Sequence, residues 1–194
     1  MSDLILLRHG ATALTGSRYS GRGGVADAGG PGLSGVGEAQ AAAVAGLLAA
    51  ESIDAVVSSP LRRALSTAEV VGARLGRVPA VDVDLAEVDF GVFEGLTYGE
   101  AQARWPGEME RWLGDPAVAP PGGESVLRLR ERVLRARDRL PAGRVLVVSH
   151  STPIQLLLAD ALGLAPAGAL RLRVGPGSVS HMDSHGVAYV NRLP

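Results

Sequence analysis

The sequence contains no cysteine and no lysine. Without cysteine, the chain has no disulfide, no thiolate metal site and no cysteinyl nucleophile. Without lysine, it lacks the amino group that P-loop enzymes, protein kinases and Schiff-base enzymes require. These absences exclude several classes of covalent and nucleotide-dependent catalysis, and they leave arginine as the permanent cation of the chain.

Strong net charge and long apolar runs are missing as well. The formal net charge of −1 at pH 7 gives no electrostatic footprint for nucleic acid. No apolar run approaches the ~20 residues of a membrane-spanning helix, and the first apolar stretch is too short for a secretion signal. We therefore expect a cytoplasmic protein that binds neither nucleic acid nor membrane. The length of 194 residues predicts one domain, spanning residues 1–194.

Short apolar segments alternate with helical patterns along the chain. Strands are predicted at residues 4–7, 53–57, 78–83 and 145–148, with a terminal hairpin at 178–193. Helices are predicted at residues 34–48, 59–75, 126–140 and 152–162, with shorter helical turns after residues 97 and 109. Ser59-Pro60 and Thr152-Pro153 are typical of a helix cap followed by a first-turn proline. The alternation predicts an α/β fold, a three-layer α/β/α sandwich with a mostly parallel sheet.

The first predicted strand runs directly into Arg8, His9 and Gly10. Its four apolar residues are continuous, as in a strand that is buried on both faces. The carboxyl end of such a strand opens into the crevice where α/β proteins bind ligands. Arginine offers a planar fork of donors to phosphate or carboxylate, and histidine is a nucleophile or a proton carrier.

Two further strand ends carry polar residues to the same edge. One strand ends before Ser59 and Arg62, and another ends in Ser149 and His150. Arg62 is expected in the first turn of its helix, where free N–H groups and the helix dipole favour an anion. Arg63, about 100° further round the helix, is expected at the surface. Two arginines and two histidines around one crevice predict a site for a phosphoryl group.

A phosphoryl group beside a histidine indicates transfer through a phosphohistidine. His9 in its neutral form would attack phosphorus while the cations hold the oxygens, because catalysis here is mainly positioning and charge stabilisation. An alcohol leaving group also needs a proton, and the segment 84–89 supplies Asp84, Glu87 and Asp89 as candidate acids. The few histidines and the lack of a carboxylate cluster argue against a metal site, so we expect neither metal nor cofactor.

Five motifs in this order resemble the histidine phosphatase superfamily, which contains the cofactor-dependent phosphoglycerate mutases. They are residues 6–12 (LLRHGAT), 58–64 (SSPLRRA), 87–95 (EVDFGVFEG), 122–125 (GGES) and 148–150 (VSH). The resemblance implies a phosphoglycerate mutase-like fold without a metal. It also implies that His9 is the phosphorylated nucleophile and Glu87 the proton donor, and that the phosphoryl group contacts Arg8, Arg62 and His150.

The substrate side follows the family pattern less closely. Thr15, Ser20 and Ser151 stand where many relatives have asparagine, glutamine and glycine, and the loop between Val25 and Pro31 looks longer than usual. Segments 18–23 and 147–154 look most like the bacterial acid phosphatase and α-ribazole phosphatase branch. The resemblance thus implies a set of substrate-binding residues: Thr15, Arg18, Tyr19, Ser20, Gly21 and Ser151.

We therefore expect a metal-independent phosphatase that hydrolyses a small phosphorylated metabolite, such as α-ribazole phosphate or a sugar phosphate. One alternative is a phosphoglycerate mutase with the same site, which the lack of long insertions and of an aromatic-rich segment near the acid disfavours. A second is a non-catalytic module that binds a phosphorylated ligand, which the presence of both histidines and the acid disfavours. The assembly state, including a homodimer, is left open.

Overall fold

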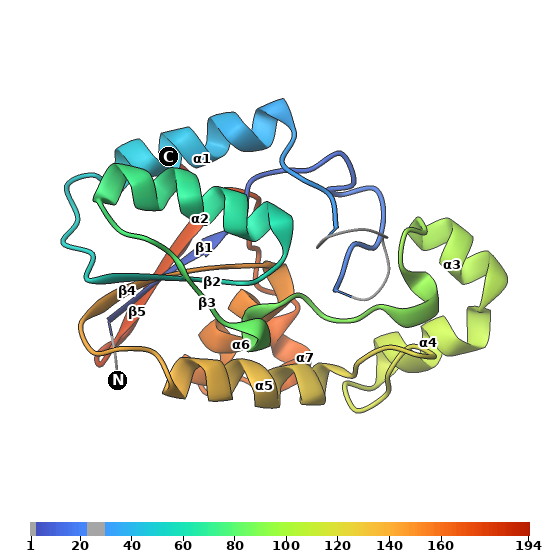
Figure 1. Ribbon diagram of the computed structural model, residues 1–194. Helices are drawn as coiled ribbons and strands as arrows, with labels where there is room; N and C mark the ends of the chain where they lie inside the picture. Colours follow the sequence, from blue (N-terminus) through green and yellow to red (C-terminus); the bar gives the residue numbers. More distant parts are fainter. Residues whose placement is uncertain (1–2, 23–29) are drawn as a thin grey trace.

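The computed structural model describes residues 3–22 and 30–194, and its centre is a six-stranded sheet (Figure 1). The strands lie in the order β3-β2-β4-β1-β5-β6. Their bounds are β1 Asp3–Arg8, β2 Ala55–Ser58, β3 Ala80–Val81, β4 Arg144–Ser149, β5 Val179–Asp183 and β6 Gly186–Arg192. Neighbouring strands among the first four are parallel, and β5 is antiparallel to β1 and to β6. The prediction of a mostly parallel sheet and of a terminal hairpin is confirmed.

Helices cover both faces of the sheet (Figure 1). One face carries α1 (Gly35–Leu47) and α2 (Arg62–Leu75), and the other carries α5 (Val126–Asp138), α6 (Ser151–Ala161) and α7 (Pro166–Ala169). Two further helices, α3 (Tyr98–Arg104) and α4 (Pro106–Gly114), lie beyond one end of the sheet, and η1 (Val83–Leu85) and η2 (Gly91–Phe93) are single 3₁₀ turns. The predicted three-layer sandwich is confirmed. None of the helices in the described ranges is long and apolar enough to cross a membrane.

The central strand β1 shows why this chain forms three layers. Leu4 and Leu6 pack into the core under α5 and α6, whereas Ile5 and Leu7 pack into the core under α1 and α2. All four side chains are buried, because alternate residues of a strand point to opposite faces and both faces are covered by helices. A continuous apolar run in the sequence thus indicates a strand at the centre of the sandwich.

The third strand is much shorter than predicted. We expected residues 78–83, but β3 contains only Ala80–Val81 at the edge of the sheet. Val78 is 92% exposed and Val83 is 67% exposed, so their apolar character does not reflect burial. Asp82 then caps the 3₁₀ turn η1 by accepting from the Asp84 backbone N–H at 2.9 Å, which ends the strand.

Two helices begin at positions different from those predicted. Helix α2 has Leu61 as its N-cap, so Pro60 precedes the helix, and the Ser59 hydroxyl instead accepts from the Leu61 N–H at 3.2 Å. Helix α6 has His150 as its N-cap and begins at Ser151. Proline tolerates both settings, because N–H groups in the first helical turn have no intrahelical partner. The later start of α2 changes which arginine enters the site.

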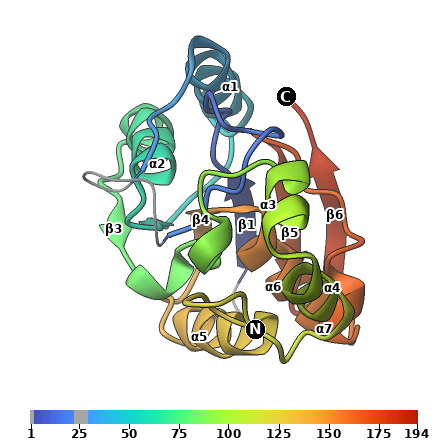
Figure 2. The same cartoon turned by 90° about the vertical axis from the view of Figure 1, so that its right-hand side faces the viewer.

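The carboxyl ends of the central parallel strands are aligned along one end of the sheet. Arg8 lies opposite Ser149, and Ser58 lies opposite Val148. The residues that follow each strand therefore emerge side by side, on the side of the molecule that faces the viewer in Figure 2. Helices α3 and α4 stand beyond this end of the sheet (Figures 1 and 2).

Candidate active site

A cavity of about 190 Å³ opens at the carboxyl ends of these strands. Among the predicted site residues, its walls contain Arg8, His9, Thr15, Arg18, Tyr19, Ser20, Glu87 and Ser151. Three other predicted residues, Arg62, His150 and Gly21, are not on its walls, and Arg63 is on the wall instead of Arg62. The structure thus brings most of the predicted constellation together around one cavity.

His9 lies at the end of β1 with its ring fixed in one tautomer. Its Nδ1 is 2.7 Å from the Gly10 carbonyl oxygen, and because a carbonyl only accepts, Nδ1 carries the proton. Nε2 is then the atom with the free electron pair, and it accepts from Arg63 Nε at 3.2 Å. The neutral ring therefore presents its nucleophilic nitrogen to a guanidinium.

Arg63 is the arginine that α2 contributes to the site. Its side chain is only 1% exposed, and besides the bond to His9 its Nη2 donates to the Ser20 carbonyl at 2.9 Å. Burial lowers the pKa of this guanidinium, while the charges of Glu87 and Glu94 raise it. The prediction that Arg63 lies at the surface is wrong.

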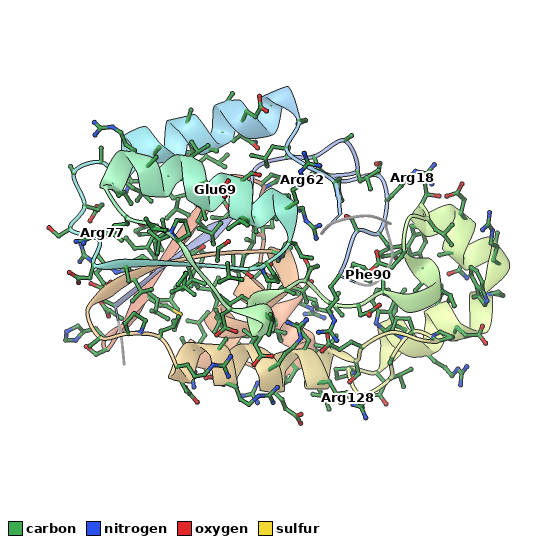
Figure 3. All side chains as sticks on the ribbon, in the orientation of Figure 1. Arg18, Arg62, Glu69, Arg77, Phe90 and Arg128 are labelled. Atoms are coloured by element: carbon green, nitrogen blue, oxygen red, sulfur yellow. The ribbon has the colours of Figure 1, made fainter. Side chains whose placement is uncertain are left out.

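Arg62 instead lies on the exposed side of α2 (Figure 3). It lines a separate hollow between α1 and α2, together with Glu38 and Glu69. The physical reason is the helix start: with Leu61 as the N-cap, Arg62 is the first helical residue and Arg63 the second. The predicted cap, Ser59, lies two residues before the observed one. Because successive helical residues are about 100° apart, this shift exchanges which arginine faces the cavity and which faces solvent.

Several donors around His9 are buried without a partner in residues 3–22 and 30–194. They are Arg8 Nε, Arg63 Nη1 and His150 Nδ1, which we call the orphan donors. Arg8 is held by the bond that its Nη1 donates to the Val174 carbonyl at 2.6 Å. Buried donors are almost always hydrogen-bonded in folded proteins, so three of them beside one cavity indicate a site for an anion.

His150 lies directly behind His9, fully buried, with the ring centroids 5.0 Å apart. Its Nε2 is 2.7 Å from the Ser59 hydroxyl, which already accepts from the Leu61 N–H. If Nε2 also donated to this hydroxyl, the serine O–H would have no acceptor in the described parts of the chain. The serine therefore donates to Nε2, and the proton of the neutral ring is on Nδ1.

Both site histidines are held neutral. Burial lowers the pKa of His9 and of His150 well below 6.5, and the positive charge of Arg63 lowers both further. For His9, the Gly10 carbonyl opposes this effect without overcoming it. A neutral His9 keeps its nucleophilic electron pair at neutral pH and into the acid range.

This arrangement predicts a loss of stability in mild acid. The unfolded chain takes up protons on these histidines near pH 6.5, whereas the folded chain does not, so the free energy of unfolding should fall as the pH drops below 6.5. The expected slope is about 1.4 kcal/mol per pH unit for each histidine. Urea unfolding between pH 7 and pH 5 measures it, with the variant His9→Asn as a control that should lose part of the slope. A free energy of unfolding that is constant over this range would contradict the neutral pair.

Glu87 reaches the cavity from the loop that follows η1. It is 7% exposed, and its Oε1 accepts from the Val88 N–H at 3.0 Å while Oε2 lies 3.5 Å from the Thr152 backbone nitrogen. The carboxyl group is thereby held between its own loop and the first turn of α6. This position suits a group that delivers a proton into the cavity.

The position of Glu87 depends on a buried arginine that the sequence analysis missed. Arg132 donates to the carbonyl oxygens of Asp84, Ala86 and Glu87 at 2.7, 2.7 and 2.9 Å, and it forms two 2.8 Å bonds with Glu124. Arginines of an amphipathic helix usually lie on its solvated face, but Arg132 is 4% exposed. The signal was present, because residue 132 follows Leu129 by three positions and so shares its buried side.

The predicted substrate-binding residues fall into two groups. Thr15, Tyr19, Ser20 and Ser151 line the cavity and are available to a ligand. Arg18 lines it too, but its Nη1 donates to the Gly95 carbonyl at 2.7 Å and pairs with Glu100 at 3.0 Å.

Gly21 has a structural setting. Its N–H donates to Glu94 Oε2 at 2.9 Å, and a Cβ at this position would collide with the Val88 carbonyl. The predicted long loop between Val25 and Pro31 lies mostly outside the described residues. Within the described ranges, no three histidine, aspartate or glutamate side chains gather in a way that could hold a metal ion.

Comparison with known proteins gives one consistent result. Residues 4–192 match the histidine phosphatase superfamily (branch 1). A bifunctional protein of Mycobacterium tuberculosis is 48% identical over 183 residues, which cover 91% of this chain and 49% of that protein. The chain thus spans about half the length of that relative.

Two further matches are proteins named as phosphatases. The glucosyl-3-phosphoglycerate phosphatase of Mycolicibacterium vanbaalenii is 38% identical over 173 residues, covering 83% of this chain and 74% of that protein. The crystal structure of the α-ribazole phosphatase from Shigella flexneri superposes with a TM-score of 0.83 at 27% identity, covering 98% of this chain and 95% of that one. The resemblance inferred from the five motifs is confirmed.

Proposed function

Because this chain belongs to the histidine phosphatase superfamily, we propose that it hydrolyses a small phosphomonoester through a phosphohistidine at His9. The observation that carries the proposal is the surroundings of His9 Nε2. This atom has a free electron pair at the wall of a cavity, and the orphan donors lie around it. A phosphoryl group satisfies the donors and the nucleophile together, because its oxygens accept while its phosphorus is attacked.

The reaction has two steps that share these groups. In the first, His9 Nε2 bonds to phosphorus, the ester P–O bond breaks, and the leaving oxygen takes a proton from the Glu87 carboxyl group. Before this attack, Arg63 shifts its hydrogen bond from His9 Nε2 to a phosphoryl oxygen, which frees the electron pair of Nε2, and Arg8 stabilises the charge on the phosphoryl oxygens. In the second step, water gives a proton to the Glu87 carboxylate and attacks phosphorus, the P–N bond breaks, and phosphate leaves with His9 restored.

His150 has a supporting part in this scheme. Ser59 keeps the proton of the neutral ring on Nδ1, which makes His150 a donor beside the phosphoryl group without a positive charge of its own. A neutral donor suits this position, because Arg8 and Arg63 already bring two buried cations to the site.

The proton donor is tested by the variant Glu87→Gln. Its turnover of an alkyl phosphate such as glycerol phosphate should fall by roughly 10²-fold, because an alkoxide is a poor leaving group without a proton. Its turnover of p-nitrophenyl phosphate should fall much less, because that phenolate leaves unprotonated. Steady-state phosphate release on both substrates measures the difference.

The matched control is Asp84→Asn, which changes a carboxylate three residues earlier, in η1. The Asp84 carboxylate pairs with Arg139 outside the cavity. This variant should leave the ratio between the two substrates unchanged. An equal loss on both substrates in Glu87→Gln would make this residue a structural one, and Asp89 would become the next candidate for the acid.

For the substrate we propose only a chemical class, a small phosphorylated metabolite. The phosphatase relatives are named for a phosphorylated glucosyl-glycerate and for α-ribazole phosphate, and a phosphate-release screen over sugar phosphates, nucleotides, phosphoglycerates and α-ribazole phosphate would rank them. Assaying phosphoglycerate isomerisation beside phosphate release separates a mutase. The single domain over residues 1–194, the cytoplasmic location and a homodimer stay predictions.

A further inference from the structure

We propose that a second, apolar cavity beside the phosphoryl site receives a compact apolar group on the alcohol half of the substrate. The substrate class is then a phosphomonoester whose alcohol carries a single ring or a short branched alkyl chain. This inference rests on the proposed function, because it assumes that a phosphomonoester is cleaved at His9.

The second cavity measures about 110 Å³ and is almost entirely apolar. Its walls combine side chains from the loop after η1, from α4, from the starts of α5 and α6, and from the end of α7: Val88, Phe90, Trp112, Leu113, Val126 and Leu170, together with Thr152. No charged side chain is among these walls, and their polar groups are the Thr152 hydroxyl and the Trp112 indole, whose Nε1 is buried without a partner in the described residues. An anionic group would lose its hydration there without a counter-charge, so the walls select an uncharged group that is mainly apolar.

This apolar cavity adjoins the cavity at His9, which is the phosphoryl site, and shares two wall residues with it. Phe90 and Thr152 line both cavities. Figure 3 shows Phe90 on the segment that leads from the strand ends toward α3 and α4. A ligand bound at His9 therefore has Phe90 and Thr152 as the boundary between its phosphoryl group and the apolar space.

The chemistry fixes which half of the substrate points across this boundary. The leaving oxygen must meet the acid, and the Oε2 atom of Glu87 lies 3.5 Å from the Thr152 backbone nitrogen. The residue after Glu87 is Val88, which is itself a wall of the apolar cavity. The alcohol half of the ester thus leaves on the side of Thr152, with the apolar walls immediately beyond.

The size and rigidity of the walls define the group that fits. An engineered cavity of about 150 Å³ with similar walls binds benzene, so 110 Å³ suits one small ring or a branched alkyl chain. Phe90 packs edge-on against Trp112 with ring centroids 5.8 Å apart, and against Tyr19 at 4.9 Å. This aromatic packing forms part of the wall before a ligand arrives.

The mouth of the apolar cavity exposes surface that a ligand would cover. Leu113 is 56% exposed and Leu170 is 49% exposed, although both line the cavity. The two walls shared with the phosphoryl site favour the substrate as the occupant. A second copy of the chain would instead cover Leu113 and Leu170 from outside, and the experiment separates the two.

The test compares the hydrolysis of benzyl phosphate and ethyl phosphate by wild type and by Leu113→Glu. We expect wild type to favour benzyl phosphate by roughly tenfold in kcat/KM, mainly through a lower KM, as is typical of filling an apolar pocket. Leu113→Glu should abolish most of this selectivity, mainly through a higher KM for benzyl phosphate. The ratio of kcat/KM for benzyl phosphate to kcat/KM for ethyl phosphate is compared between variants. This comparison cancels the intrinsic reactivity of the two esters.

The matched control is Leu193→Glu, which places the same charge at a leucine of similar exposure, 61%, outside both cavities. It should keep the wild-type ratio. An unchanged ratio in Leu113→Glu overturns the subsite, and a change in oligomeric state by size-exclusion chromatography without a change in the ratio assigns this face to a protein contact. Failure of the proposed function is distinct, because wild type would then release phosphate from neither ester.

Discussion

Replacing Arg63 by alanine should lower kcat/KM by roughly 10²–10³-fold, the scale of losing one preorganised charge stabiliser. Arg63 is buried against His9, and its Nη1 is one of the orphan donors, so its removal deprives the phosphoryl oxygens of a cation at the point where charge develops. Arg63→Lys should recover only part of the activity, because an ammonium group lacks the planar fork of donors. Steady-state kinetics on a single phosphomonoester measures both variants.

The neighbouring Arg62→Ala is the natural control, since it removes the same charge one position earlier on the same helix. Its side chain lines the hollow between α1 and α2, and its kinetics should stay within about twofold of wild type. A large loss in Arg62→Ala together with normal kinetics in Arg63→Ala would contradict the placement of these two side chains.

Replacing His9 by alanine should lower turnover by at least ~10³-fold, because the covalent route disappears and only binding and charge stabilisation remain. Wild type incubated with labelled substrate and quenched should carry an acid-labile phosphate, and His9→Ala should carry none. The variant should still fold, because His9 follows the buried part of β1 and belongs to neither of the two main cores.

His150→Asn supplies the complementary measurement. His150 lies behind His9 with Nε2 engaged by Ser59, so its loss should slow the reaction and leave the label on residue 9. A label that persists in His9→Ala and disappears in His150→Asn would reverse the assignment of the nucleophile.

The elements that the sequence predicts well are those whose burial follows directly from local pattern. The apolar run before Arg8 identifies a central strand because only a strand covered on both faces is uniformly apolar. The parallel arrangement then places His9, His150 and Ser59 at one edge, since Arg8 and Ser149 are in register. The shared location of His9, His150 and the loop that carries Glu87 was therefore accessible from the sequence.

The features that the sequence predicts poorly depend on helix phase and on tertiary partners. Ser59-Pro60 has the composition of a cap, yet the serine hydroxyl is engaged by Leu61 and His150, and the helix begins later. The spacing from Leu129 marks Arg132 as a residue on the buried side of α5, but it does not identify the loop carbonyls that receive its donors. Those carbonyls are 45 to 48 residues away in the sequence, and no local pattern encodes the contact.

The apolar cavity was inaccessible for a similar reason. The exposed Leu113 and Leu170 carry no sequence pattern that marks them as cavity walls. They come together because α4 and the end of α7 meet the loop at Phe90. Such a cavity is formed where connecting segments meet, and the core strands do not dictate that meeting.

The pairing of Arg132 with Glu124 limits how this protein can evolve. One guanidinium holds the loop that carries the acid, and one carboxylate neutralises it away from water. A lineage that lost either partner alone would keep an uncompensated buried charge, so the two positions should drift only as a pair. Selection that preserves proton delivery would thus also act on Arg132 and Glu124, although neither contacts the substrate.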